Sequence, residues 1–144
     1  MGKKVLTLLL VVSMAFSAAF PVFASEKVNT LEDSNSEIHL FWVNTDTVRT
    51  DLEFSGTRAD CSCVIHAKDG TSKITATAYL KRVNSNGTTT VKAWTGLSAS
   101  GDTFDFDGSY YVASGYTYEF ELDAGITRNG VTEYISVTDS DYCG

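Results

Sequence analysis

The acidic residues before Gly108 are the first group in this chain that could do chemistry. Asp102, Asp105 and Asp107 precede that glycine, and a hard cation such as Ca²⁺ needs clustered oxygen ligands. Their spacing lacks the D-x-D-x-D-G pattern of an EF-hand loop and its distal bidentate glutamate. The three residues are therefore a candidate for a surface calcium site, and an EF-hand is excluded.

No arrangement of side chains in the sequence predicts catalysis. His39 and His66 are the only histidines, and neither lies in a nucleophile motif such as G-x-S-x-G. Glu119 and Glu121 could be paired as an acid and a base. They alternate with apolar residues, however, and so belong to a strand face that is solvated in any case. We therefore expect no enzymatic activity and no cofactor.

Three cysteines allow at most one intramolecular disulfide. Cys61 and Cys63 lie two apart on a predicted strand, so their Cα atoms are about 6.6 Å apart, too stretched for an easy mutual bond. We expect one of them to pair with Cys143. Cys61 is preferred, because the end of a strand can more readily meet the chain terminus, and Cys63 is the alternative. The remaining thiol is then either a small buried hydrophobe or a point of intermolecular coupling.

Tyr79, Lys92 and Trp94 form a third group, whose placement depends on how two strands pair. A two-residue Asn86-Gly87 turn would place Lys81 opposite Lys92, a like-charge pair that costs stability. A four-residue loop over 84–87 instead pairs Tyr79 with Lys92 and Thr77 with Trp94, and it brings apolar residues together on the other face. We therefore expect the four-residue loop.

In this register Tyr79 and Trp94, with Lys92, share one face of the sheet. Exposed rings among threonines would make a flat platform for a sugar or a peptide. The alternative is structural. Phe41 and Trp42 of an N-terminal strand would cover the rings, or Trp94 would itself be the buried tryptophan of a sandwich.

The elements that must position these groups are strands, because apolar residues recur at every second position and turn residues interrupt them every eight to twelve positions. The strongest turn signal is Asn129-Gly130, where both positions tolerate the positive φ of a type I′ turn. A two-residue loop there pairs Ala124 with Ile135 and Leu122 with Val137. Seven or eight strands and no helix predict an all-β fold, an antiparallel immunoglobulin-like β-sandwich, with a closed barrel as the alternative. The predicted strands are 38–43, 48–54, 61–67, 73–83, 88–94, 103–107, 116–123 and 131–137.

The N-terminal residues have the features of a secretion signal. Lys3 and Lys4 precede an apolar run over 5–20, and Ala24 ends a small-residue cleavage pattern. We expect residues 1–24 to be a cleaved signal peptide, 25–37 a flexible acidic arm and 38–144 a single β-sandwich domain. The chain carries 18 acidic and 11 basic residues, and cleavage removes two lysines and changes the net charge from −7 to −9. Such a charge argues against nucleic-acid and anionic-membrane binding.

Several short motifs carry a resemblance to a known family. They are Ala59-Asp60-Cys61, Ser72-Lys73-Ile74-Thr75-Ala76-Thr77 leading into Leu80-Lys81-Arg82, Thr90-Val91-Lys92-Ala93-Trp94, Gly115-Tyr116-Thr117-Tyr118 and the near-terminal Cys143. From Gly56 onward this order resembles a functionally uncharacterised family of small secreted β-sandwich proteins of Gram-positive bacteria. The resemblance implies a sandwich, export and a Cys61–Cys143 pairing, and it implies no activity.

Together these observations favour a secreted, non-catalytic extracellular binding module. Its ligand is expected to be an extracellular glycan or protein, and the module is expected to be a monomer, released or held loosely at the cell wall. The second interpretation is a structural or self-associating cell-surface protein that uses exposed edges or a free thiol. An enzyme or a calcium-binding protein is the third.

Overall fold

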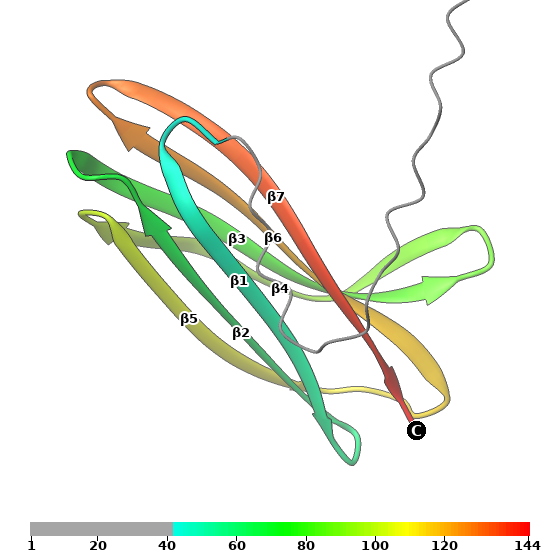
Figure 1. Cartoon of the computed structure of the whole chain (residues 1–144). Coiled ribbons are helices and arrows are strands. Elements are labelled where there is room, and N and C mark those ends of the chain that lie inside the picture. The colour runs from blue at the N-terminus through cyan, green and yellow to red at the C-terminus, as the bar shows by residue number, and fades with distance from the viewer. Residues whose placement is uncertain (1–41) are drawn as a thin grey trace, which may run out of the picture. The chain divides into compact units, whose positions relative to one another are not determined.

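Seven antiparallel strands in two sheets make up the computed structural model, which describes residues 42–144 (Figure 1). The strands are β1 (Thr45–Ser55), β2 (Arg58–Ala67), β3 (Thr71–Asn84), β4 (Gly87–Ser100), β5 (Thr103–Tyr111), β6 (Tyr116–Arg128) and β7 (Val131–Cys143). The predicted signal peptide, the acidic arm and residues 38–41 lie outside the described residues. Trp42 and Val43, expected to end a strand, are not part of one. The described residues contain no helix long and apolar enough to cross a membrane.

The strands form one sheet in the order β1-β2-β5 and another in the order β4-β3-β6-β7. The all-β sandwich is therefore confirmed, and the alternative of a single closed sheet is wrong. Every neighbouring pair is antiparallel, and each strand alternates between a face turned to the other sheet and a face turned to solvent.

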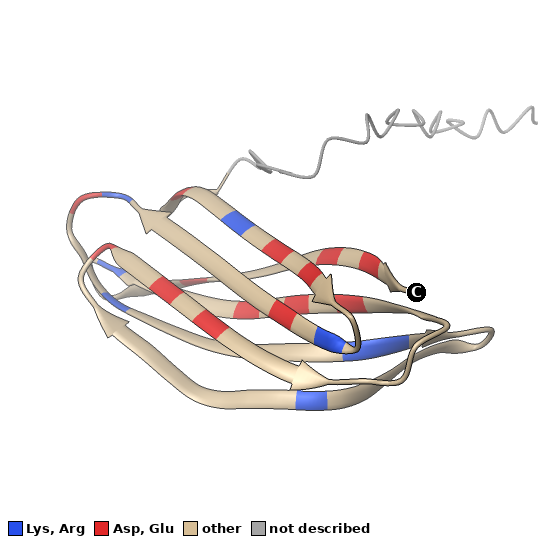
Figure 2. Cartoon of the chain, turned by 90° about the horizontal axis from the view of Figure 1, so that it is seen from below, with Lys and Arg blue, Asp and Glu red and all other residues tan. Residues whose placement is uncertain are grey.

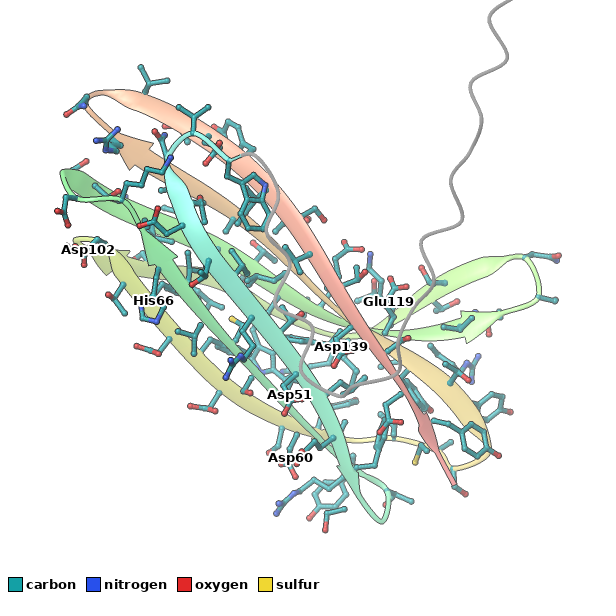
Figure 3. All side chains as sticks on the ribbon, viewed as in Figure 1. Asp51, Asp60, His66, Asp102, Glu119 and Asp139 are labelled. Carbon is teal, nitrogen blue, oxygen red and sulfur yellow. The ribbon has the colours of Figure 1, made fainter. Side chains whose placement is uncertain are left out.

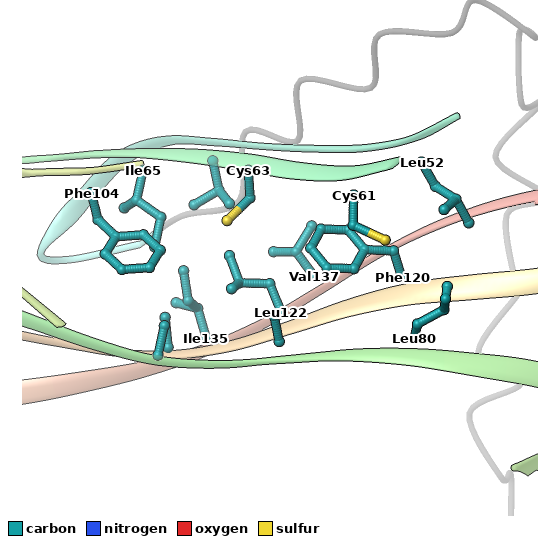
Figure 4. Packing of buried hydrophobic residues seen from close by; sticks show 14 of the residues in the cluster. Leu52, Cys61, Cys63, Ile65, Leu80, Phe104, Phe120, Leu122, Ile135 and Val137 are labelled. Carbon is teal, nitrogen blue, oxygen red and sulfur yellow. The ribbon is translucent and has the colours of Figure 1, made fainter. Parts of the chain in front are cut away.

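The core lies between the sheets and is built from the inward positions of this alternation (Figure 4). As predicted, Cys61, Cys63 and Ile65 share the buried face of β2, and Phe120 and Leu122 share that of β6. The other fully or nearly fully buried apolar residues are Val48, Leu52, Ala59, Ala67, Ile74, Ala76, Ala78, Leu80, Phe104, Tyr118, Ala124, Ile126, Ile135, Val137 and Cys143.

The β6–β7 hairpin has the predicted register. Arg128 pairs with Val131, Ala124 with Ile135 and Leu122 with Val137. Asn129 and Gly130, the two turn residues, both have positive φ, 52° and 78°, as a type I′ turn requires.

The β3–β4 hairpin follows the predicted register only near its turn, where Val83 pairs with Thr88. A bulge then inserts one extra residue, Val91, into β4. Beyond it Tyr79 pairs with Ala93 and Ala78 with Trp94. The predicted pairs Tyr79–Lys92 and Thr77–Trp94 are therefore wrong. A shift by one residue turns the side chains of 92–94 to the opposite face, until a second bulge between Trp94 and Leu97 shifts the pairing by one residue more.

Side chains of β7 close the seam between the edge strands β1 and β7. The Asp139 carboxylate accepts a hydrogen bond from the Leu52 backbone N–H at 2.9 Å (Figure 3). The Glu133 carboxylate accepts from the backbone N–H groups of Val43 and Asn44, at 2.6 and 3.0 Å, and from the Thr45 hydroxyl at 3.0 Å. These bonds satisfy donors that an edge strand would otherwise leave open to pairing with another chain.

Candidate binding groove

A groove of about 750 Å³ crosses the four-stranded sheet. One row of cross-strand neighbours spans it, with Ser98 of β4 beside Thr75 of β3, Thr75 beside Gly125 of β6, and Gly125 beside Tyr134 of β7. A second row runs through Thr77, Asp123 and Ser136. The remaining lining residues are Lys73, Ala76, Gly96, Leu97, Ala124 and Ile135.

Gly125 forms part of the floor of this groove. A Cβ atom there would lie 3.1 Å from the Thr75 hydroxyl and 3.2 Å from Cε1 of Tyr134, closer than side chains pack without moving. The Thr75 hydroxyl in turn donates a hydrogen bond to the Gly125 carbonyl at 3.4 Å. The glycine therefore lets the Tyr134 ring lie against the sheet and keeps the floor low.

Tyr134 is the most exposed large apolar side chain of the described residues, at 83%. A tyrosine ring offers apolar area and a hydroxyl that can donate and accept hydrogen bonds. Around it the groove supplies the hydroxyls of Thr75, Thr77 and Ser136 and the carboxylate of Asp123. Binding sites for small molecules commonly combine an apolar surface with a few polar groups around it.

Trp94, one of the predicted platform residues, lies on the other side of the sheet. It pairs with the buried Ala78, and its ring meets Phe106 of β5 edge-on, with centroids 5.4 Å apart. Gly108 leaves room for it, because a Cβ there would lie 3.0 Å from the indole. Trp94 is thus partly buried and packs against the core. This placement is nearer to the predicted alternative, a buried sandwich tryptophan, than to an exposed platform residue.

Tyr79 and Lys92 are likewise separated. Tyr79 faces outward beside Lys81, whose Nζ lies 5.3 Å from the ring centroid and 2.6 Å from the Glu121 carboxylate. Lys92 pairs with the buried Leu80, and its Nζ lies 5.7 Å from the Trp94 ring. The structure therefore does not bring Tyr79 together with Lys92 and Trp94, and the Val91 bulge is the reason.

The three cysteines are buried free thiols. Cys143 donates a weak hydrogen bond from Sγ to the Gly56 carbonyl at 3.5 Å, whereas Cys61 pairs with Leu52. Leu52 lies within β1, whereas Gly56 follows the end of that strand in the β1–β2 turn. All three thiols are free, so the predicted Cys61–Cys143 disulfide and its Cys63 alternative are absent from the structure.

Burial also governs the reactivity of Cys61 and Cys63. Loss of solvation raises the pKa of both thiols to about 12, with a further contribution from Asp60 at Cys61 and from Asp105 and Asp107 at Cys63. A thiol reacts as its thiolate. Cys63 is therefore poorly placed for intermolecular coupling while the domain is folded.

The predicted calcium ligands do not converge. Asp105 and Asp107 lie on the outer face of the three-stranded sheet, where they pair with Val64 and Ser62 of β2. Asp102 lies in the turn before β5 and accepts a hydrogen bond from the Thr103 hydroxyl at 3.3 Å. Within residues 42–144, no three of the His, Cys, Asp and Glu side chains are grouped so that they could hold a metal ion.

The outer face of the three-stranded sheet is acidic (Figure 2). Asp51, Glu53, Asp60 and Asp107 surround a hollow of about 360 Å³. Burial, and to a smaller extent the nearby Asp139 carboxylate, raise the pKa of Asp51, whereas Arg49 lowers it. His66 lies on this face too, on the opposite side of β2 from the cysteines, as its position predicted.

Sequence reasoning missed the groove, although one signal for it was available. The Asn129-Gly130 turn fixes the β6–β7 register, and that register places Tyr134 opposite Gly125. An aromatic side chain opposite a glycine on a solvent-facing row has no side-chain neighbour to cover it.

Compared with protein-family models, curated proteins and solved structures, the chain shows no match.

Proposed function

We propose that this chain is a secreted, non-catalytic module that binds an extracellular saccharide in the groove of the four-stranded sheet. The observation that carries the proposal is the Tyr134 ring, held against Gly125 and left 83% exposed. The apolar face of a sugar ring stacks on such an aromatic surface, and its hydroxyls need donors and acceptors close by. Thr75, Thr77 and Asp123 supply them.

The lining of the groove favours binding over catalysis. It contains a single carboxylate, Asp123, and no histidine. Hydrolysis of a glycosidic bond generally uses two carboxyl groups on opposite sides of that bond. Export follows from the signal-like residues 1–24, and we expect the released protein to be a monomer.

The architecture is immunoglobulin-like in this proposal. With the strands lettered A to G in chain order, the sheets are A-B-E and D-C-F-G. They differ from the constant-type arrangement only in the fourth strand, which pairs with the third instead of the fifth. The Tyr118 hydroxyl near the start of β6 donates to the Ala113 carbonyl at 2.8 Å, as in the tyrosine corner of such domains.

A sedimentation assay with insoluble cell-wall polysaccharides tests the proposal. We expect the wild-type protein to be retained and Tyr134→Ala to lose about tenfold in affinity, the scale of losing a central aromatic contact. Tyr142→Ala is the matched control, because Tyr142 is also exposed and lies on β7 outside the groove. Lack of retention of the wild type, or equal retention of Tyr134→Ala, would refute saccharide binding in the groove.

A further inference from the structure

One end of the sandwich carries a set of exposed tyrosines, which we call the tyrosine-rich end. It comprises Tyr110, Tyr111, Tyr116 and Tyr142, half of the eight large apolar side chains exposed in the described residues. Tyr111 pairs with Arg58 beside the β1–β2 turn, and Tyr116 pairs with Cys143. Tyr110 lies opposite the buried Ala59 and Tyr116 opposite the buried Cys143, so both occupy inward-facing rows. Tyr111 and Tyr142 lie on the alternate, outward-facing rows.

The backbone at this end is held in place from several sides. The Val112 N–H donates to the Thr57 carbonyl at 2.8 Å, and the Gly115 N–H donates to the Cys143 carbonyl at 2.6 Å. The Tyr118 hydroxyl fixes Ala113 between them. A surface that is ordered before binding loses less conformational entropy when a partner arrives.

Two cations lie against these rings. The Arg82 guanidinium is 4.8 Å from the centroid of Tyr116, and the Lys92 ammonium is 5.9 Å from that of Tyr110. Both side chains project from the inward-facing rows of β3 and β4, since Arg82 lies opposite Tyr118 and Lys92 opposite Leu80. Here the β3–β4 hairpin extends beyond the sandwich (Figure 1).

Neither cation is neutralised within the described part of the chain. The ion pairs found there join Arg58 to Asp60 and Lys81 to Glu121. Arg82 instead donates to the Asn84 side-chain oxygen at 3.3 Å. Two uncompensated positive charges among aromatic rings, in a chain with a net charge of −7, can accept an anionic partner without first breaking an ion pair.

We propose that the tyrosine-rich end, with Arg82 and Lys92, binds an acidic segment of a partner protein. Tyrosine and arginine are among the side chains enriched at protein–protein interfaces. Residues 109–118 consist of Tyr, Ser, Gly, Ala, Val and Thr alone, a composition close to that of antibody paratopes. An anionic polymer without apolar groups would use the two cations and leave the rings of Tyr110 and Tyr116 without partners. A protein segment uses both.

Short synthetic peptides rich in Glu and Leu, with matched peptides carrying Gln in place of Glu, test this site by fluorescence anisotropy. We expect the Glu peptides to bind more tightly than the Gln peptides. In the Arg82→Gln/Lys92→Gln variant the affinity should fall about tenfold, as for loss of a charge-assisted hydrogen bond. A Lys73→Gln/Arg128→Gln variant removes the same charge elsewhere and should bind like the wild type.

Two results would overturn the proposal. One is equal binding of Glu and Gln peptides. The other is tight binding of polyglycerol phosphate with no binding of the peptides, which would assign the surface to an anionic polymer. Tyr134→Ala should keep its peptide affinity, so this test stands apart from that of the groove.

Discussion

Two glycines set the positions of the two most informative aromatic side chains. Gly108 of β5 makes room for Trp94, and Gly125 of β6 makes room for Tyr134. Neither has a positive φ, so the requirement at both positions is for space and not for an unusual backbone. The result differs with the face. Trp94 seals the side of the core, and Tyr134 stays open to solvent.

At Gly108 an added methyl group would overlap side chains that pack against the core. We expect Gly108→Ala to lower the free energy of unfolding by about 1–3 kcal/mol, because the added Cβ would lie 2.6 Å from the Phe106 ring and 3.0 Å from the Trp94 indole, and both rings must move. Urea unfolding followed by tryptophan fluorescence measures the change. Ser109→Ala, at the exposed neighbouring position, should leave the unfolding midpoint unchanged, and an equal loss in both variants would contradict the packing argument.

At the scale of the strand, the Val91 bulge decides on which face Trp94 lies. Deleting Ala93, beyond the bulge, would move Trp94 into the position opposite Tyr79, on the outer face of the sheet. We expect this deletion to cost about 2–4 kcal/mol, because the contact of Trp94 with Phe106 is lost. The tryptophan emission should also shift to the red as the indole becomes hydrated.

The matched control is Val91→Ala, which shortens a half-buried side chain but keeps the chain length. It should unfold at a urea concentration close to that of the wild type and should keep the wild-type emission maximum. A deletion variant with the wild-type spectrum would show that the strand pairing absorbs the missing residue elsewhere.

The two hairpins show why sequence predicts one strand pairing and not the other. Nothing interrupts the alternation around Asn129-Gly130, so its turn chemistry and the apolar pairs of β6 and β7 lead to one register, and the structure has it. In β4 the extra residue Val91 lies between Thr90 and Lys92 and carries no turn signal. A bulge there is favoured by the packing of Trp94 on the other sheet, a contact between residues far apart in the sequence.

For the groove, the sequence predicts the residue types but not how the strands bring them together. The β6–β7 register places Tyr134 opposite Gly125 and so indicates an uncovered ring. The groove also needs Ser98 of β4 beside Thr75, and this pairing depends on the bulges of β4, which no local pattern reports. The buried faces of β2 and β6 were predictable, because period-two alternation by itself separates core from solvent.

At the scale of the whole molecule, the buried thiols make stability depend on alkaline pH. Cys61 and Cys63 titrate near 12 in the folded protein instead of at the ordinary 9.0. Between these values the unfolded chain releases protons that the folded chain keeps. The free energy of unfolding is therefore unaffected by these groups below pH 9.0 and falls above it, by up to about 1.4 kcal/mol per pH unit for each thiol.

Urea midpoints measured under reducing conditions from neutral pH upward test this dependence. The Cys61→Ala/Cys63→Ala variant should be less stable at neutral pH, because it leaves cavities in the core. Its stability should nevertheless decline less steeply above pH 9.0 than that of the wild type. Parallel slopes for the two proteins would mean that other groups govern the alkaline transition.

The seam between β1 and β7 determines how the domain bears mechanical load. Both strands run in the same direction, from the end where Asn44 bonds the Val131 carbonyl to the end where Cys143 bonds the Gly56 carbonyl. Tension applied between Trp42 and Gly144 would therefore pull the two strands past each other lengthwise. The Glu133 and Asp139 hydrogen bonds would share this shearing force, whereas a peeling force would break them one at a time.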